Sequence, residues 1–486
     1  MDTLEDPKLL KTQAYIAGEW VDAQDGAVIE VRNPANGELM AEVSSVGADE
    51  TRRAIEAAEA ALPDWSARAP KERAQIMKRW FELIMENQED LAVLMTAEQG
   101  KPLLESRGEI AYGASFIEWF AEEAKRVYGD VISSARSDQR LLTIKQPIGV
   151  VAAITPWNFP NAMITRKAGP ALAAGCTVVL KPASSTPLSA LALAELGERA
   201  GLPAGTLNVV AGRSGPIGGE LTSNPAVRKL TFTGSTEVGK RLMEACAGTV
   251  KKTSMELGGN APFIVFDDAD LDAAVAGTMA SKYRNAGQTC VCANRILVQS
   301  GVYDDFCARL KLAVEALRVG DGSHEQVDIG PLIDLKAAQD VDALVQDALQ
   351  KGASAAVGGR PSELGGSYYE PTLLMEAHSD MRVFREEIFG PVAPIFRFET
   401  EAEAVAMAND TEFGLASYFY SRDIGRIWRV SEALEYGIVG VNEGIISTEV
   451  APFGGVKESG IGREGSKYGI DDYVELKYLC LGGIKD

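Results

Sequence analysis

Short apolar runs rich in β-branched residues recur about every 20–30 residues through the second quarter of this 486-residue sequence. Four of these runs begin at residues 149, 176, 206 and 228, and read GVVAAIT, CTVVLKP, TLNVVAG and RKLTFTG. Between them lie segments with helical spacing, such as PLSALALAELGERAG. Such alternation is typical of βαβ units, in which helices cover both faces of a parallel sheet. The sequence therefore predicts an α/β protein with a parallel sheet.

A second block of the same kind starts at residues 260–270 (NAPFIVFDDAD) and continues to about residue 440. Upstream, residues 51–127 have apolar positions three and four apart, which predicts several amphipathic helices. Two β-like stretches, 140–150 and 473–482, fall outside both blocks. Strands left outside a core often pair between subunits. We therefore expect two Rossmann-like α/β domains and a small β oligomerisation arm.

Charge and cysteine usage exclude several classes of protein. The net charge of −21 repels nucleic acid and anionic lipid surfaces. No segment has the apolar length of a membrane span, and the first residues lack the pattern of a secretory signal. Six scattered Cys are typical of reduced cytosolic thiols rather than of a disulfide framework. We therefore expect a cytoplasmic protein that binds neither nucleic acid nor membranes.

Two thiols lie one residue apart in YRNAGQTCVCANR, as Cys290 and Cys292. We expect no metal site, because further ligands at close spacing are lacking and the only two His lie in charged, loop-like stretches. Residues 287–289 interrupt the helical pattern of 271–285 and place Cys290 on a loop beside a helix end, where a thiol can be activated. Cys292 is either a small buried hydrophobe or a redox partner that forms a strained, reducible disulfide with Cys290.

A glycine-rich stretch, TFTGSTEVGKR (231–241), follows a predicted strand and opens a helix. It is not expected to be a P-loop, because Arg241 stands where a Ser or Thr hydroxyl would bind Mg²⁺. The helix end still offers N–H groups to a phosphate, although a plain tight turn explains the pattern as well. Lys181 and Ser184 follow another strand, where open α/β sheets bind ligands. A neutral residue at 184 beside Lys181 favours NADP over NAD, because a carboxylate there would repel a 2′-phosphate.

Two further stretches are unusual. TPWNFP holds Asn158 just past a strand end, and SMELGGNAP holds Glu256 in an apolar run before two glycines. A lone Asn at a turn is normally structural, and a lone Glu is normally solvated. These two stretches occur in one order along the chain with four other motifs, and this combination indicates a functional role rather than a structural one.

The motifs occur in the order PWNFP, FTGSTEVGK, MELGGNAP, GQTCVCANR, EEIFGPV and PFGGVKESGIGRE. Together they resemble the aldehyde dehydrogenase superfamily, and the resemblance covers the chain from about residue 14 to 486. It implies an enzyme that oxidises an aldehyde with a nicotinamide dinucleotide. The implied domains are a dinucleotide-binding domain (1–130 and 150–260), a catalytic domain with the nucleophilic Cys (261–440) and an oligomerisation arm (131–149 and 465–486).

The resemblance implies a catalytic role for four residues. Cys290 would attack the aldehyde to form a thiohemiacetal, and hydride transfer to the nicotinamide would leave a thioester. Asn158 and the backbone N–H of Cys290 would hold the oxyanion, and Glu256 would deprotonate the water that hydrolyses the thioester. Lys167 would support the catalytic centre. A relative that kept the fold and lost the chemistry is the alternative, against which the intact Cys290, Glu256 and Asn158 argue.

The implied cofactor site places Lys181 at the adenosine ribose, Ser235 at the pyrophosphate and Glu387 at the nicotinamide ribose. NADP is the preferred cofactor, and NAD is possible. The cofactor-binding residues that the resemblance implies are Pro156, Trp157, Lys181, Ser184, Gly215, Thr233, Gly234, Ser235, Gly239, Leu257, Glu387 and Phe389.

Two longer stretches, NAMITRKAGPALAAGCTVVLKPAS and KYRNAGQTCVCANR, are similar to succinate-semialdehyde dehydrogenases, particularly the bacterial NADP-using form. Their carboxylate-binding residues match Arg166, Arg284 and Ser447 here, so the resemblance implies a carboxylated aldehyde as substrate. A guanidinium can bind a carboxylate through two hydrogen bonds, and six helical residues rise about 9 Å, which would let Arg284 reach a four-carbon chain held at the thiol.

Several alternatives stay open at this point. The two Arg side chains would instead form ion pairs if they were structural. Glutarate semialdehyde, one methylene longer, is the rival substrate, since one methylene changes binding by only about 1–3 kcal/mol. The resemblance also implies a homo-oligomer, a tetramer, and a role in GABA degradation.

Overall fold

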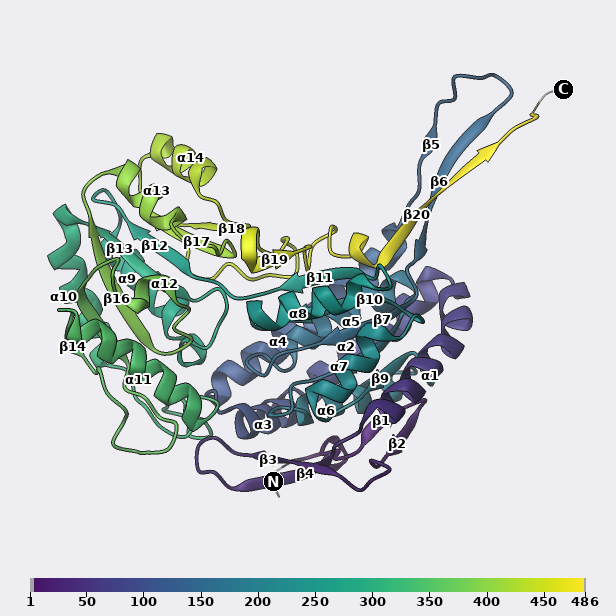
Figure 1. Cartoon of the computed structure of the whole chain (residues 1–486), viewed down its shortest axis with the longest axis horizontal. Coiled ribbons are helices and arrows are strands. Elements are labelled where there is room, and N and C mark those ends of the chain that lie inside the picture. The colour runs from purple at the N-terminus through teal and green to yellow at the C-terminus, as the bar shows by residue number, and fades with distance from the viewer. Residues whose placement is uncertain (1–3, 485–486) are drawn as a thin grey trace.

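The computed structural model describes residues 4–484 and has two lobes with a projecting arm (Figure 1). The eight-stranded lobe is built on a sheet whose strands β11, β10, β7, β8 and β9 are parallel neighbours. In spatial order the strands are β19 (Gly460–Ile461), β11 (Lys252–Glu256), β10 (Val227–Thr233), β7 (Val150–Ile154), β8 (Thr177–Lys181), β9 (Leu207–Val209), β1 (Ala14–Ile16) and β2 (Glu19–Val21).

Helices cover both faces of this sheet, which is why its central strands are apolar along their whole length. Alternate residues of β7 therefore enter different cores: Val151 packs with one buried cluster, and Val150 and Ala152 pack with another. The helices are α1 (Ala48–Ala67), α2 (Pro70–Glu86), α3 (Gln88–Gln99), α4 (Leu103–Glu123), α5 (Ala162–Ala174), α6 (Leu188–Arg199), α7 (Ser214–Ser223) and α8 (Thr236–Ala247).

The seven-stranded lobe repeats this architecture, with six parallel strands and the antiparallel edge strand β14. In spatial order its strands are β14 (Ser354–Val357), β15 (Thr372–Ala377), β16 (Val392–Phe398), β13 (Ala293–Gln299), β12 (Ala261–Val265), β17 (Ala416–Tyr420) and β18 (Ile438–Val441). Its helices are α9 (Leu271–Lys282), α10 (Tyr303–Glu315), α11 (Leu335–Gln350), α12 (Arg382–Arg385), α13 (Glu401–Asn409) and α14 (Ile424–Ala433).

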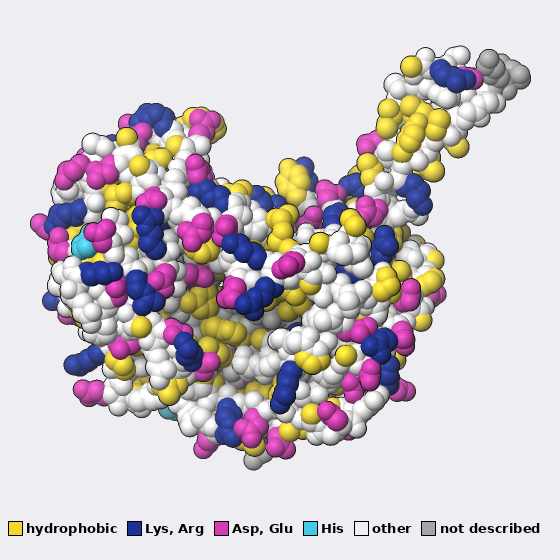
Figure 2. All heavy atoms as spheres, viewed as in Figure 1, with side chains coloured by type: hydrophobic (Ala, Val, Ile, Leu, Met, Phe, Trp, Pro, Cys, Tyr) yellow, Lys and Arg dark blue, Asp and Glu magenta, His cyan; other side chains and the backbone are white. Residues whose placement is uncertain are grey.

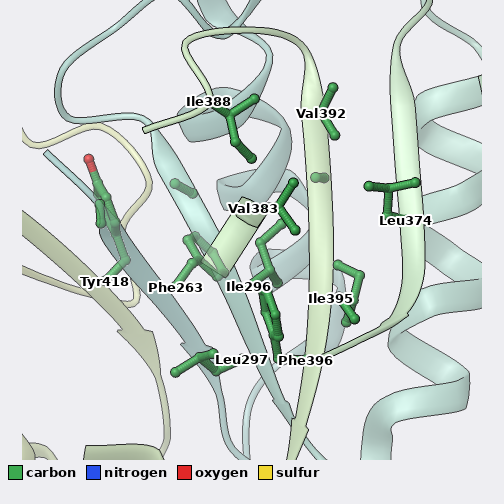
Figure 3. Close-up of a cluster of buried hydrophobic side chains, with 14 of the residues drawn as sticks. Phe263, Ile296, Leu297, Leu374, Val383, Ile388, Val392, Ile395, Phe396 and Tyr418 are labelled. Carbon is green, nitrogen blue, oxygen red and sulfur yellow. The ribbon is translucent and has the colours of Figure 1, made fainter. Parts of the chain in front are cut away.

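The core of the seven-stranded lobe is shown in Figure 3. Branched side chains of β13 and β16, such as Ile296 and Ile395, are fully buried and pack with Leu374 of β15 and Val383 of α12. This core fixes the position of β13, which begins three residues after Cys290.

A three-stranded arm projects from the eight-stranded lobe (Figure 1). It consists of β5 (Val131–Ile132), β6 (Arg140–Pro147) and β20 (Val474–Leu481), with β6 and β20 paired antiparallel along their full length. A separate hairpin of β3 (Val28–Arg32) and β4 (Leu39–Ser44) lies below the two lobes in Figure 1.

The expected fold class, two α/β sheets and a β arm, is therefore confirmed. The exact domain boundaries stay a prediction. Among residues 4–484, every helix is too short or too polar to cross a lipid bilayer.

Candidate active site

A cavity of about 270 Å³ lies between the two lobes, and the hollow is visible in Figure 2. Side chains of both lobes line it, and most of its surface is apolar. The cavity brings together these predicted residues: Pro156, Trp157, Asn158, Arg166, Thr233, Gly234, Ser235, Leu257, Arg284, Cys290, Glu387, Phe389 and Ser447. The other predicted residues lie outside its lining: Lys167, Lys181, Ser184, Gly215, Gly239, Glu256 and Cys292.

Strand register explains why residues far apart in sequence meet here. Ile154, at the end of β7, pairs with Lys181 at the end of β8. Thr233, at the end of β10, pairs with Glu256 at the end of β11. Because these strands are parallel, their carboxyl ends form one edge, where ligands bind in open α/β sheets. Asn158 follows β7 by four residues, so it lies on the same edge.

Asn158 is buried and held from two sides. Its amide Nδ2 donates to the backbone oxygen of Gln288 at 3.0 Å, in the loop before Cys290. Its own backbone oxygen accepts hydrogen bonds from Lys101 Nζ at 2.7 Å and from Asn285 Nδ2 at 2.9 Å. One of the two Nδ2 hydrogens is left for another acceptor, and Asn158 lines the cavity together with Cys290.

The loop that carries Cys290 has an unusual backbone. Asn285, Ala286 and Gly287 have φ values of 51°, 54° and 75°, three successive left-handed residues after α9. Gly287 also needs to be glycine because a Cβ there would lie 2.1 Å from the backbone oxygen of Gly390. Such strained backbone is concentrated at functional sites, where the surrounding structure holds it in place. Here it turns Cys290 toward the cavity.

The Cys290 thiol is protonated at neutral pH in this setting. Burial and then the Glu387 carboxylate raise the pKa of Cys290 to about 12, against the opposing effect of Arg166. Glu256 is near enough to add to the rise. A base must therefore take the thiol proton before the sulfur can act as a nucleophile.

Glu256 lies behind the cavity lining at the end of β11, and its Oε2 has no hydrogen-bond partner within residues 4–484. Burial, and then the nearby Glu464 carboxylate, raise the pKa of Glu256 well above its usual range. A buried carboxyl group with a raised pKa suits general acid–base chemistry near neutral pH.

Glu464 was not predicted from the sequence. It forms ion pairs with Lys167 Nζ and with Arg166 Nε, the latter at 2.9 Å, and all three side chains are buried. Burial alone would raise the pKa of Glu464, but Lys167 and Arg166 hold it below its usual range. Lys167 therefore reaches the catalytic centre through Glu464. The only sequence signal for Glu464 was its place in the motif PFGGVKESGIGRE.

The two lobes are joined beside the nucleophile by residues 257–260, which link β11 to β12. A Cβ at Gly259 would lie 2.4 Å from the backbone oxygen of Cys290, so only glycine allows this close approach. The Gly259 N–H also donates to Glu387 Oε1 at 3.0 Å. Burial raises the pKa of Glu387 to about 7, although this hydrogen bond opposes the rise.

The surface beside the cavity fits a dinucleotide. Ser235 is the N-cap of α8 and makes no side-chain capping bond, so its hydroxyl and the N–H groups of that helix are available to a pyrophosphate. Lys181 pairs with no acidic side chain among the described residues and donates to the Pro182 backbone oxygen at 2.9 Å. Burial lowers the pKa of Lys181 to about 8. An uncompensated buried ammonium suits an anionic ligand.

The remaining residues of the predicted cofactor site lie around this surface. Ser184 donates its hydroxyl to the backbone oxygen of Gly212 at 2.9 Å, and Gly215 lies in the first turn of α7. Gly239 packs its helix α8 against Leu257, since a Cβ there would meet the Leu257 side chain. Phe389 makes an edge contact with Trp157, with ring centres 5.6 Å apart.

The other end of the cavity is positively charged. Arg166 and Arg284 both line it, with Ser447 and the hydroxyl-bearing Tyr112. Arg166 Nη1 donates to the Tyr112 hydroxyl at 3.3 Å, and Arg166 Nη2 has no partner among the described residues. Arg284 forms no ion pair there either, and its buried Nε has no partner. The expectation of structural ion pairs therefore applies to Arg166 through Glu464, but not to Arg284.

Seven other lining residues were not predicted from the sequence, because single aromatic, glycine or apolar positions carry no signal of their own. They are Tyr112, Phe159, Met163, Gly258, Thr289, Val291 and Phe453.

Cys292 is buried just beyond the cavity, with its thiol 3.2 Å from the backbone oxygen of Lys282, and both Cys290 and Cys292 are free thiols. No group of three His, Cys, Asp or Glu side chains in residues 4–484 is arranged to hold a metal ion.

Comparison with known proteins gives the family directly. The model of the aldehyde dehydrogenase family matches residues 20–479. The chain belongs to the aldehyde dehydrogenase family. As a member of this family it is an oxidoreductase that acts on aldehydes.

Three relatives show how similar the chain is to other aldehyde dehydrogenases. It is 65% identical to glutarate-semialdehyde dehydrogenase of Pseudomonas aeruginosa, over 99% of this chain and 100% of that one. It is also 65% identical to the succinate-semialdehyde dehydrogenase GabD of Escherichia coli, whose name specifies NADP(+), over 99% of both chains. The crystal structure of succinate-semialdehyde dehydrogenase from Burkholderia pseudomallei superposes with a TM-score of 0.98 at 61% identity, over 99% of this chain and 100% of that chain.

Proposed function

We propose that this protein oxidises succinate semialdehyde to succinate with reduction of NADP⁺. The observation that carries the proposal is the cavity with Cys290 and two Arg side chains in its lining, in a chain whose net charge is −21. An acidic protein repels a small anion unless a local positive site attracts it. Arg166 Nη2 and Arg284 Nε are both buried there without a protein partner among residues 4–484, so they are available to a carboxylate.

In this proposal the substrate is held at both ends. The carboxylate lies between the guanidinium groups, and Ser447 and Tyr112 add hydroxyl donors. The aldehyde carbon lies at the sulfur of Cys290. Addition of the thiolate forms a carbon–sulfur bond and moves an electron pair onto the carbonyl oxygen. The free Nδ2 hydrogen of Asn158 donates to that oxyanion, as the hydrogen bond to Gln288 uses only one of the two.

Lys181 and the N-terminus of α8 at Ser235 would hold NADP⁺, which would supply the hydride acceptor for the thiohemiacetal. The chain then completes the reaction on the thioester at Cys290. A water molecule attacks the acyl carbon, Glu256 takes the water proton, and the Cys290 sulfur leaves with the electron pair of the carbon–sulfur bond. The nearby Glu464, held by Lys167, contributes to the raised pKa that lets Glu256 carry a proton near neutral pH.

The preference for NADP is supported by the surroundings of the adenosine ribose site. Lys181 is cationic there, Ser184 is neutral, and GabD of E. coli, at 65% identity, carries NADP(+) in its name. Comparison of kcat/KM with NADP and with NAD tests this proposal, and a strong preference for NAD would contradict it.

Glutarate semialdehyde is the second candidate substrate. The glutarate-semialdehyde dehydrogenase of P. aeruginosa is as similar to this chain as GabD is, at 65% identity. The two substrates differ by one methylene, which is worth only about 1–3 kcal/mol in a pocket. The ratio of kcat/KM for the four-carbon and five-carbon semialdehydes decides between them.

The substitution Arg284→Met tests the proposed substrate class. Arg284 is the cleaner choice because removal of Arg166 would leave buried Glu464 short of a partner. Hydrogen bonds to charged groups contribute about 1.5–3 kcal/mol, so kcat/KM for succinate semialdehyde is expected to fall about 10- to 100-fold.

The matched control for this substitution is a substrate rather than a variant. Butanal has the same chain length without the carboxylate, and its kcat/KM is expected to stay within about threefold. Equal losses for both aldehydes would remove Arg284 from carboxylate binding.

We propose further that the chain works as a homo-oligomer, a tetramer, in the cytoplasm. The arm of residues 131–149 and 465–486 would then serve as the oligomerisation element, beside a dinucleotide-binding domain of 1–130 and 150–260 and a catalytic domain of 261–440. Exposed apolar residues on the arm, Val131 and Leu476 among them, support the proposal of a homo-oligomer. Six free thiols without a disulfide support the proposal of a cytoplasmic location.

A redox role for Cys292 is also proposed. Peroxide would oxidise the thiols of Cys290 and Cys292 to a disulfide, with two molecules of water formed, and dithiothreitol would reverse the reaction. The 3.2 Å contact of the Cys292 thiol with the Lys282 backbone means that the loop must move first. If Cys292→Ala loses and regains activity in the same way as the wild type, the pairing is wrong.

A further inference from the structure

Lys101 is buried at the junction of α3 and α4 and makes three contacts around the catalytic cavity. Its side chain is only 1% exposed. The ammonium donates to Glu109 Oε2 at 2.5 Å and to the backbone oxygen of Asn158 at 2.7 Å. It also lies 3.9 Å from the centre of the Phe159 ring. A buried Lys is costly, so such a complete set of partners needs an explanation.

The carboxylate of Glu109 extends this arrangement to the start of α5. Its second oxygen, Oε1, accepts the N–H groups of Asn161 and Ala162, at 2.9 and 3.2 Å. One ion pair therefore connects the beginning of α4 to the Asn158 loop and to the first turn of α5. Asn158 lies between these attachments, so neither its peptide nor its side chain can move freely.

Stability alone does not account for this ion pair. Replacement of a buried ion pair by apolar residues is often neutral or stabilising, because desolvation offsets the attraction. The pair contacts, however, the backbone of Asn158, whose side-chain amide binds the loop before Cys290 and lines the cavity together with Cys290. Asn285 Nδ2 adds a second donor to the same Asn158 oxygen, at 2.9 Å. Two donors on one backbone oxygen fix the plane of that peptide.

The Phe159 contact extends the effect to the substrate end. The guanidinium of Arg284 lies over the same ring, 5.4 Å from its centre. Lys101 therefore holds the ring beside which Arg284 lies, as well as the peptide that carries Asn158. Both the developing oxyanion and the proposed carboxylate site depend on where this one ammonium sits.

We infer that Lys101, with Glu109, is a positioning residue that aims the Asn158 amide at the oxyanion formed on Cys290. The inference deepens the proposed function, because the oxyanion is that of the aldehyde reaction. Lys101 itself does not line the cavity among the described residues, and it acts through two residues that do, Asn158 and Phe159. Its effect is expected on the rate of acyl transfer, with little effect on the binding of a substrate that lacks a carboxylate.

The test uses 4-nitrophenyl acetate with the full-length protein. The Cys290 thiolate attacks this ester, forms an acetyl thioester and releases 4-nitrophenolate, through an oxyanion at the same place. The reaction needs neither the dinucleotide nor a carboxylate on the substrate. Its burst rate therefore reports on the position of Asn158 even if succinate semialdehyde proves not to be the substrate. Cys290→Ala gives the background rate.

The decisive variant is the double substitution Lys101→Met/Glu109→Gln, which removes both charges of the ion pair together. Misplacement of a catalytic group by about 1 Å costs on the order of 10²-fold, so the burst rate is expected to fall about 30- to 100-fold. The KM for the ester is expected to change less than about threefold, and the melting temperature by a few degrees at most.

Two comparisons separate positioning from support of the fold. Lys101→Met alone leaves Glu109 buried without its cation and should melt earlier than the double variant, yet both should share the same low burst rate. Lys78→Met/Glu122→Gln removes a half-exposed pair of the same kind, 3.2 Å apart, and should match the wild type. A burst rate for the double variant within threefold of wild type would overturn the inference. A rate loss that follows the melting temperature across the variants would overturn it as well.

Discussion

Cys290, Glu256 and Glu387 lie in surroundings that disfavour a negative charge on any of them. Burial is the largest cause in each case, and it raises the pKa of Glu387 to about 7 and that of Cys290 to about 12. A thiolate at Cys290 therefore exists only when its proton has a destination. The Oε2 of Glu256 has no hydrogen-bond partner among residues 4–484 and is a buried acceptor for the proton of the hydrolytic water.

The raised pKa of Cys290 predicts how alkylation by iodoacetamide depends on pH in the cofactor-free protein. Only the thiolate reacts, and its fraction grows about tenfold per pH unit below the pKa. The alkylation rate is therefore expected to rise without a plateau from about pH 6.5 to about pH 9.5. Mass spectrometry of the peptide that carries Cys290 gives the rate. A plateau near neutral pH would show a thiol that ionises far more easily.

Two substitutions separate the roles of the thiol and the buried carboxyl. Cys290→Ser is expected to abolish turnover and to leave NADP binding intact, because Cys290 carries the acyl group and not the cofactor. Glu256→Gln is expected to form the thioester and then hydrolyse it at least about 100-fold more slowly, as the loss of a general base costs about 10²–10⁴-fold.

Stopped-flow measurement of NADPH formation distinguishes the two variants. The Glu256→Gln protein should give one equivalent of NADPH per active site and then stall, with an acyl adduct of Cys290 in the mass spectrum. Steady turnover near the wild-type rate in either variant would contradict the assigned roles.

A functional residue could be predicted from the sequence only where a short motif around it indicates its chemistry. Asn158, Glu256 and Cys290 stand in short motifs with glycine or proline nearby, and the structure places Asn158 and Cys290 in the cavity lining and Glu256 behind it. Lys101 stands in no such motif, and Glu464 only ends the motif PFGGVKESGIGRE, which does not single it out. Their importance rests on partners 57 and 297 positions away in the chain, Asn158 and Lys167, and no local pattern reports such a distance.

Among the elements, the link between the lobes is the most restrictive. The segment from β11 to β12 carries Glu256 at its start and passes the Cys290 loop with no room for a side chain at Gly259. Four parallel strands end at the same edge, so the positions of Asn158, Lys181 and Thr233 follow from strand register alone. Helix α4 completes the site from outside the sheet, with Glu109 and Tyr112 on its inner face.

The substitution Gly259→Ala tests this restriction. The added Cβ would lie 2.4 Å from the Cys290 backbone oxygen, and the nucleophile loop must shift to relieve the clash. A shift of about 1 Å is expected to lower kcat about 100-fold. Gly108→Ala is the matched control, because it lies on an exposed turn of α4 with nothing within 4 Å of a Cβ. Unchanged kcat in Gly259→Ala would show that the loop adapts without cost.

The apolar runs predicted β7, β8 and β10 within one residue at each end and β9 within three residues, because both faces of a parallel strand are buried and the whole run is apolar. The edge strands escaped prediction. β1 pairs antiparallel with β9 (Tyr15 with Val209), and β19 pairs antiparallel with β11 (Met255 with Ile461), while β2 pairs only with β1. Edge pairing of this kind leaves only a weak local pattern, since one side of the strand has no neighbour.

In the whole molecule, each of the two lobes contributes a different part of the active site. The eight-stranded lobe supplies Asn158, Glu256 and the surface around Lys181, while the seven-stranded lobe supplies Cys290 and Glu387. The cavity exists only between them, and most of its wall is apolar, which strengthens the few charged contacts inside it. The arm takes no part in this cavity, and its apolar residues face outward (Figure 2).

The proposed assembly predicts the effect of charge on the arm. Val131 and Leu476 are 87% and 64% exposed in the isolated chain, on β5 and β20. Exposed apolar residues on a long edge are typical of a covered interface, and two buried Lys side chains would oppose such contact. The variant Val131→Lys/Leu476→Lys is therefore expected to shift the mass measured by sedimentation equilibrium from a tetramer to smaller species. Leu312→Lys changes a 70% exposed residue on α10 and is the control. An unchanged mass in the arm variant would show that subunits associate through another surface, because an arm that carries two new charges cannot bury them without partners.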